Sequence, residues 1–145
     1  VHGSMTMTRE SDYAVRIMRA LSHGSLKTVK EICGEEAIPT QFAYKILKKL
    51  SNAGLIQIIR GAAGGYKLDK DLHDVSLLDI MHAIGEKGVV NACIQDNYQC
   101  TWREKYHKPC QVHEELVRIQ GTLDHELERH SIHEILYGES KGETH

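Results

Sequence analysis

Hydrophobic residues recur at helical spacing in the first part of the chain and predict a series of short helices. One face of a first helix, over residues 9–22, carries Tyr13, Ile17, Met18 and Leu21. Thr28 and Glu31 have the spacing of a capping box, in which each side chain bonds a free backbone N–H at a helix start. A second helix is therefore expected from Thr28. Pro39 suits the first position of a third helix, where a missing N–H costs nothing.

The third helix, over residues 40–53, has the clearest amphipathic pattern. Its buried stripe is expected to comprise Phe42, Ile46, Leu47 and Leu50. Its other side carries Thr40, Gln41, Tyr44, Lys45, Lys48 and Lys49. Residues 55–59 and 66–68 then have the pattern of two strands joined by a glycine-rich turn. These elements predict a mainly α fold with a small β-hairpin, a winged helix-turn-helix over residues 5–85.

The second half of the chain alternates helical patterns with a long stretch of no regular pattern. Ser76 is expected to begin a helix, and residues 86–110 have the character of a functional loop. A long helix then follows from Gln111, and Ser131 begins a last short helix with another capping box. The long helix carries apolar residues close to a heptad seam, namely Val112, Leu116, Ile119, Leu123 and Leu127.

That seam can pack on its own domain or on a second subunit. We favour the second subunit, because a protomer of 145 residues has little core to cover such a helix. Residues 111–137 are therefore predicted to form a C-terminal dimerisation helix and a short terminal helix. Residues 1–4 are interpreted as a cloning scar, and residues 138–145 as a flexible tail.

Charge is distributed unevenly along the chain, although the formal net charge is only −2. Residues 5–73 carry 11 Lys/Arg against 7 Asp/Glu, and residues 74–145 carry 7 against 13. Between Ala37 and Leu68 there is no acidic residue. A basic stretch of this kind is the electrostatic footprint of a polyanion site, although a solvated basic face has the same composition.

Three of the four cysteines, Cys93, Cys100 and Cys110, fall in the loop at residues 86–110. The chain has neither a secretion signal nor an apolar run long enough for a membrane helix, so a cytoplasmic protein with reduced thiols is expected. Clustered thiols in that compartment indicate metal or redox chemistry. Cys33 differs, because it lies on an apolar helix face and is expected to be a core residue.

Several motifs together resemble the Rrf2 family of bacterial transcription regulators. They are residues 11–16 (SDYAVR), 38–42 (IPTQF), 45–47 (KIL), 53–56 (AGLI) and 60–66 (RGAAGGY), followed by the three spaced cysteines. The resemblance implies a homodimer of winged-helix subunits that binds a palindromic DNA operator. It also implies an iron–sulfur cluster, [2Fe–2S] or [4Fe–4S], held by Cys93, Cys100 and Cys110.

The resemblance offers two candidates for the fourth ligand of the cluster. His113 matches the histidine of IscR-like members, three residues after the last cysteine. Asp12 matches the aspartate that NsrR-like members contribute from the other subunit. One departure is that six residues separate Cys93 from Cys100 and nine separate Cys100 from Cys110, both longer than the usual gaps of the family.

Other interpretations of the cysteines stay open. Soft thiolates with one imidazole or carboxylate suit an iron–sulfur cluster. A Cys₃His zinc site usually has a closely spaced cysteine pair, which is absent here. Without any metal the thiols could still sense oxidation, or a protein partner could exert control, as in a cofactor-free repressor of the CymR type.

Roles on DNA follow from the third helix, whose N-terminal residues should lie over base edges in the major groove. Thr40, Gln41 and Tyr44 are the candidates there, and Gln can pair bidentately with adenine. Tyr44 could equally be a packing residue. Three lysines, Lys45, Lys48 and Lys49, are expected on phosphates, which position the protein without specifying sequence. Arg60, in the wing, is placed for a minor groove.

The function predicted is a DNA-binding regulator that senses redox, nitric oxide or iron–sulfur status through a cysteine-ligated cluster. A redox or metal-trafficking enzyme is the distant alternative. The chain has no C-x-x-C motif, nucleophile elbow or phosphate-binding loop, so we expect no enzyme.

Overall fold

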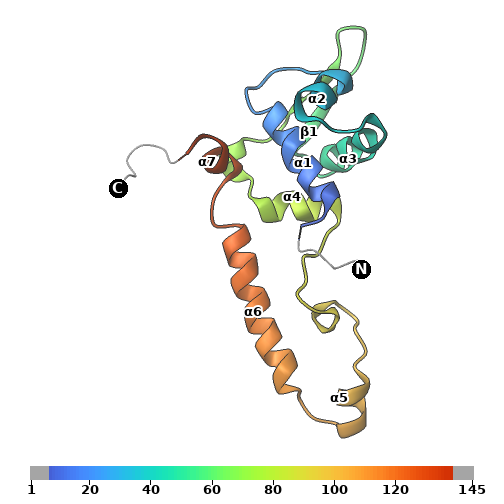
Figure 1. The fold of residues 1–145 in the computed structure, drawn as a ribbon, viewed down its shortest axis with the longest axis vertical. Helices are drawn as coiled ribbons and strands as arrows, with labels where there is room; N and C mark the ends of the chain where they lie inside the picture. The colour runs from blue at the N-terminus through green and yellow to red at the C-terminus, as the bar shows by residue number, and fades with distance from the viewer. Residues whose placement is uncertain (1–6, 139–145) are drawn as a thin grey trace.

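The computed structural model describes residues 7–138. The interpretation of residues 1–4 as a scar, and that of residues 138–145 as a flexible tail except for Gly138, concern residues outside it. Four helices form the body of the molecule around one apolar core. They are α1 (Arg9–Ala20), α2 (Val29–Glu36), α3 (Thr40–Asn52) and α4 (Leu77–Ile84). In Figure 1, α1 lies at the centre with the other three around it. The four residues predicted to face inward are all buried: Tyr13, Ile17, Met18 and Leu21. Cys33 of α2 is buried as well.

A two-stranded antiparallel hairpin forms the predicted wing. β1 (Ile56–Ile59) pairs with β2 (Gly65–Leu68), and Tyr66 also exchanges backbone hydrogen bonds of 2.9 and 2.7 Å with Lys27. Close backbone approach requires two of the glycines. A Cβ on Gly64 would lie 2.0 Å from the Ile59 carbonyl oxygen, and one on Gly65 would lie 2.6 Å from that of Lys27. The hairpin is thereby held against the segment that leads into α2.

Two details of α3 differ from the sequence-based prediction. Phe42 is not part of the buried stripe: its side chain is 45% exposed, and Ala43 is buried with Ile46, Leu47 and Leu50 instead. The helix is turned about its own axis so that the small Ala43 faces the core. Phe42 lies on the flank that faces α1, where its ring centroid is 5.9 Å from that of Tyr13. Pro39 is the N-cap rather than the first helical residue, with an extended ψ of 131°.

Residues 86–110, which we call the cysteine arm, leave the body and run to the far end of a long helix. The arm contains two short elements that the sequence did not predict, η2 (Ala92–Ile94) and α5 (Thr101–Tyr106). It leads into α6 (Gln111–Leu127), which begins where expected. Figure 1 shows α6 extending away from the body, with α5 near its distal end. None of the residues of α5, all of which are described, is buried.

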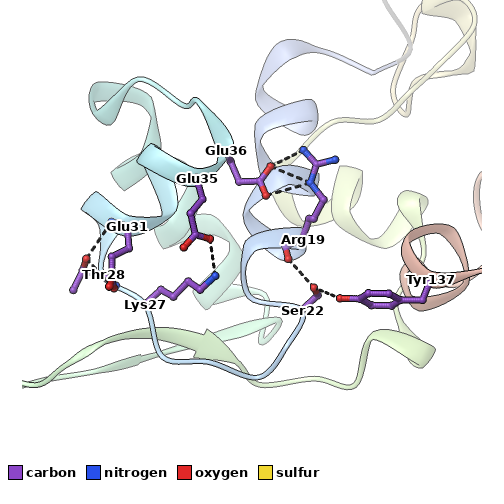
Figure 2. Close-up of polar contacts among 8 residues, drawn as sticks. All are labelled: Arg19, Ser22, Lys27, Thr28, Glu31, Glu35, Glu36 and Tyr137. Carbon is purple, nitrogen blue, oxygen red and sulfur yellow. Dashed lines mark hydrogen bonds and ion pairs between the residues drawn. The ribbon is translucent and has the colours of Figure 1, made fainter.

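The chain returns to the body through α7 (Ile132–Tyr137), which packs on η1 (Leu72–Asp74). Ser131 forms the predicted capping box with Glu134, and Ile132 is fully buried in the core. The Ile132 N–H donates a 2.7 Å hydrogen bond to the Val75 carbonyl. At the other end of α7, the Tyr137 hydroxyl bonds that of Ser22, just beyond α1 (Figure 2). The C-terminal end of α6 is therefore anchored to the body.

The predicted capping box at α2 is also present. Thr28 accepts from the Glu31 N–H, and the Glu31 carboxylate accepts from the Thr28 N–H at 2.8 Å (Figure 2). At the other end of α2, Glu36 receives a bidentate ion pair from Arg19 of α1, with a shortest distance of 2.6 Å. The box thus starts α2 locally, and the ion pair joins the last residue of α2 to α1.

Candidate nucleic-acid interface and cysteine arm

The outward face of α3 carries the polar residues that the sequence predicted for DNA. Thr40 begins the helix, and Gln41, Tyr44, Lys45 and Lys48 are exposed. At about 100° per residue, the last four lie opposite the buried stripe. No acidic residue falls on this face. The arrangement suits a helix inserted in a major groove, with amide, hydroxyl and ammonium groups available to bases and phosphates.

Lys49 lies apart from that face. Its Nζ donates to the Glu10 carboxylate at 2.8 Å and to the Ile84 carbonyl at 3.2 Å. The Lys49 side chain is half-buried, on the flank of α3 that faces α1 and α4. Lys49 therefore does not share the exposed face of Lys45 and Lys48, although the three are neighbours by helical spacing. The sequence carried no signal for this pairing, because Glu10 is 39 residues away.

Arg60 follows directly after β1 and is exposed at the start of the wing turn. The structure gives it no partner among the described hydrogen bonds and ion pairs. Its exposed position at the start of the wing turn leaves the guanidinium available to a neighbouring groove. Narrow minor grooves attract arginine by their negative potential.

The three arm cysteines are free thiols spread along the arm. Cys93 lies in η2, where its Sγ accepts from the Asn91 amide at 3.2 Å. Cys100 is the N-cap of α5 and Cys110 is the N-cap of α6. Within residues 7–138, no three side chains of His, Cys, Asp or Glu are gathered as a metal site. A single protomer thus supplies the predicted thiols without bringing them together.

Cys100 lies at the N-cap of α5, close to the backbone of Arg103 and Trp102. The backbone N–H of Arg103 chiefly, with smaller contributions from the Arg103 side chain and the Trp102 N–H, lowers the pKa of the Cys100 thiol. Hydrogen bonds to the thiolate favour the charged form. A larger thiolate fraction makes this sulfur the better nucleophile and metal ligand near neutral pH.

Cys110 and His113 are in contact across the first turn of α6, through the backbone N–H of His113. The His113 N–H points to Cys110 Sγ at 3.4 Å across the first turn of α6. His113 Nδ1 is buried and has no hydrogen-bond partner in the described part of the chain. A buried imidazole nitrogen without a partner is costly, and a bound metal or a proton donor would satisfy it. By ligand type and by this unsatisfied nitrogen, the residues fit an iron–sulfur group.

Asp12, the other candidate ligand, lies on α1 in the body. Its carboxylate pairs with Arg16 at 3.0 Å, one turn along the helix, and is about half-exposed. The structure therefore does not bring Asp12 and His113 together in one protomer. A role for Asp12 as a ligand would need an arm from a second subunit.

The family model described as an iron-dependent transcriptional regulator, Rrf2, matches residues 7–138. The chain belongs to the Rrf2 family. Curated relatives of this Rrf2-family chain include the Rrf2 protein of Nitratidesulfovibrio vulgaris, 29% identical over 66% of each chain. The transcriptional regulator NsrR of Bacillus subtilis is 25% identical over 64% of this chain and 66% of its own length. The chain spans about two thirds of the length of both relatives.

The fold is likewise shared with solved members of the Rrf2 family. The oxidised form of Staphylococcus aureus CymR superimposes with a TM-score of 0.67, covering 94% of this chain and all of that one, at 18% identity. The comparison supports the mainly helical winged-helix architecture. The family model and NsrR are both described as transcriptional regulators, so this Rrf2-family chain is a DNA-binding regulator and not an enzyme. Within residues 7–138, no helix is long and apolar enough to cross a membrane.

Proposed function

We propose that the chain acts in the cytoplasm as a homodimer that binds a palindromic DNA operator and represses transcription according to the state of an iron–sulfur cluster on its cysteine arm. The outward face of α3 is the observation that carries the DNA-binding part. Gln41 and Tyr44 are the base-reading residues, Lys45 and Lys48 hold phosphates, and Arg60 enters the adjacent minor groove.

The exposed seam of α6 supports the homodimer. Val112 is 67% exposed and Ile119 38% exposed, although both are apolar, and Leu116 and Leu123 beside them are only half-buried. These four lie within about 60° of one another around the helix. An apolar stripe of this kind on a helix that projects from its own body is typical of an interface between subunits. Two symmetric subunits would present two α3 helices to two half-sites of a palindrome.

The cluster is the finer part of the proposal. Cys93, Cys100 and Cys110 would hold it, with His113 of the same protomer or Asp12 of a second subunit as the fourth ligand. When bound, a cluster supplies a redox-active iron centre whose potential depends on its ligands. Two observations support a site at the start of α6: Cys110 caps the helix through the His113 backbone N–H, and His113 Nδ1 is buried without a hydrogen-bond partner in the described part of the chain.

DNA binding is tested with duplexes of about 30 base pairs, three helical turns, selected from a randomised pool on the purified protein. We expect an enriched palindrome, bound with a steep decrease in affinity as salt rises. Gln41→Ala should relax sequence preference, and Lys45→Met should weaken binding to all duplexes alike. Failure of the wild-type protein to enrich any duplex would exclude operator binding.

The cluster is tested by anaerobic purification, with visible absorption and analysis of iron and sulfide. We expect colour, iron and sulfide in the wild type, and their loss when Cys93, Cys100 or Cys110 is changed to Ser. Of the two variants His113→Ala and Asp12→Ala, the one that shifts the visible spectrum identifies the fourth ligand. A colourless, iron-free protein after competent reconstitution would exclude the cluster and leave the DNA-binding part intact.

A cofactor-free regulator is the second candidate, because the described residues of one protomer do not gather the three thiols. Its arm would respond to thiol oxidation or to a protein partner. Unchanged regulation in the three Cys→Ser variants would favour a partner. Regulation that is lost in those variants, in a protein that binds no iron, would favour thiol oxidation.

A further inference from the structure

The root of the cysteine arm is tied to both α1 and α3 at the C-terminal end of α4. This helix ends at Ile84, and Gly85 takes a left-handed conformation with φ of 92°. The N–H groups of Gly85 and Glu86 satisfy the carbonyls of His82 and Met81 at 3.0 and 2.9 Å. The Ile84 carbonyl is left to a partner from outside the helix, since the last carbonyls of a helix have no partner within it.

Lys49 of the DNA-facing helix supplies that partner. Its ammonium reaches the Ile84 carbonyl at 3.2 Å and the Glu10 carboxylate of α1 at 2.8 Å. A cation at a helix C-terminus also complements the helix dipole. Both oxygens lie in a half-buried setting, where solvent screens the interaction less than at the surface. One side chain of α3 thus bonds the elements on either side of it.

Glu86, the first residue of the arm, makes the second tie. Its Oε1 accepts from the hydroxyl of Ser11 at 2.7 Å and from the Thr8 N–H at 3.3 Å. Ser11 is fully buried, and Thr8 is the N-cap of α1. The carboxylate therefore lies at the N-terminus of α1, where the helix dipole favours negative charge. Glu10, one residue from Ser11, is the partner of Lys49, so the two ties share the first turn of α1.

We propose that Lys49 is a positioning residue that couples the cysteine arm to the DNA-facing helix, rather than a phosphate contact. Displacement of the arm root moves the Ile84 carbonyl and Glu86, and Lys49 transmits that movement to α3. Coupling between two sites is reciprocal, so DNA bound on α3 must also act on the arm. This inference rests on the proposed binding of DNA by α3.

The arm carries its own reporter, because Trp102 of α5 is the one tryptophan of the chain. The experiment measures Trp102 emission and duplex affinity together, across a salt series, on the duplex selected with the wild-type protein. Lys49→Met is compared with Lys48→Met, its neighbour on the exposed face of α3. Glu10→Ala removes the α1 acceptor of the same contact, and Lys49→Arg keeps a cation able to bond both oxygens. Circular dichroism confirms that each variant is folded.

We expect duplex binding to change Trp102 emission in the wild type and in Lys48→Met. Lys48→Met should lower the salt slope by about one, as the loss of one phosphate contact does. Lys49→Met and Glu10→Ala should keep the wild-type salt slope, with affinity within about threefold, and lose the emission change. Lys49→Arg should restore it.

Two results would overturn the coupling. One is a salt slope for Lys49→Met that falls as in Lys48→Met, which makes Lys49 a phosphate contact. The other is a wild-type protein that binds its duplex with no change in Trp102 emission. Absence of duplex binding by the wild type is a separate result, which removes the proposed function itself.

Discussion

The winged-helix body and the extension formed by the cysteine arm and α6 bury apolar side chains to very different extents. Within the described chain, every buried apolar residue except Ile132 lies between Tyr13 and Ile84. In the extension, by contrast, large apolar side chains are exposed, among them Val90, Tyr98, Trp102, Tyr106, Val112, Val117 and Ile119. The body thus encloses one apolar core within a single protomer. The extension has the composition of an interface and needs further contacts to bury its apolar surface.

The two regions also differ in the polar side chains that they bury. α6 is described along its whole length, and its one buried residue is Gln120. Gln120 accepts from the Val90 N–H at 2.8 Å and donates to the Gly88 carbonyl at 3.0 Å and to Asp124 at 2.9 Å. The body is held by apolar packing, while the near part of the arm is held on α6 by a fully bonded amide.

The largest expected effect comes from truncating one apolar side chain in each region. Ile17→Ala, in the body, should lower the free energy of unfolding by about 2–5 kcal/mol, because it leaves a cavity in a packed core. Val112→Ala, on the exposed seam of α6, should change the unfolding of the isolated protomer by less than about 0.5 kcal/mol. Urea denaturation at low protein concentration measures both. Equal losses would mean that α6 packs on its own body.

The next prediction separates the two flanks of α6. Ile119→Asp places a carboxylate in the proposed seam and should raise the dimer dissociation constant by about tenfold to a hundredfold, since an apolar interface does not solvate the charge. Val117→Asp adds the same charge on another side of the helix, at a residue 48% exposed. It should leave the association unchanged. Analytical ultracentrifugation measures both, and the reverse order of effects would move the interface to the flank of Val117.

Loss of the Gln120 amide should release the near part of the arm without unfolding the body. Gln120→Leu leaves the Val90 N–H and the Gly88 carbonyl without partners, at a local cost of about 1–3 kcal/mol. Hydrogen exchange of the Val90 amide should then quicken by about tenfold to a hundredfold. Gln111→Leu, at the exposed start of α6, is the control and should leave this amide as protected as before. Unchanged protection in Gln120→Leu would show that other contacts hold the segment.

The smallest expected effect concerns the reactivity of the arm thiols in metal-free protein. The Arg103 N–H lowers the pKa of the Cys100 thiol, so its thiolate fraction persists to lower pH than that of an ordinary cysteine. Iodoacetamide should therefore alkylate Cys100 before Cys33, which is buried, and its rate should fall at a lower pH than that of a free thiol. Peptide mass spectrometry across a pH series measures this. An alkylation profile for Cys100 that matches free cysteine would contradict it.

Local signals in the sequence predicted local structure well. The capping boxes predicted at the starts of α2 and α7 pair residues three apart, so a linear pattern contains both partners. Ser76, predicted only to begin a helix, forms a third box with Asp79 at the start of α4. The error at Phe42 has a different origin, because helical periodicity alone does not distinguish a stripe centred on Ala43 from one that includes its neighbour. Which of Phe42 and Ala43 is buried depends on how α3 packs against α1 and α4, and the pattern of one helix does not contain that information.

The candidate site divides in the same way. The outward residues of α3 could be predicted, since they follow from the period of one helix. Lys49 could not be separated from Lys48 without knowing that Glu10 and Ile84 lie beside it, at distances of 39 and 35 residues in sequence. The thiols were identified by type and spacing, but their separation along the arm depends on η2 and α5, neither of which has a strong pattern of its own.

The bridge between Ser76 and Ser131 closes the chain into a loop, because α7 returns to where α4 begins. Both ends of the segment between Ser76 and Ser131, which contains α4, the cysteine arm and α6, are therefore attached to the body. The entropy of closing such a loop grows only with the logarithm of its length, about 0.6 kcal/mol for each doubling. A few residues added between the cysteines change that length by a small fraction. The long gaps on either side of Cys100 thus cost the body almost nothing, and the arm can vary in length while the winged helix stays the same.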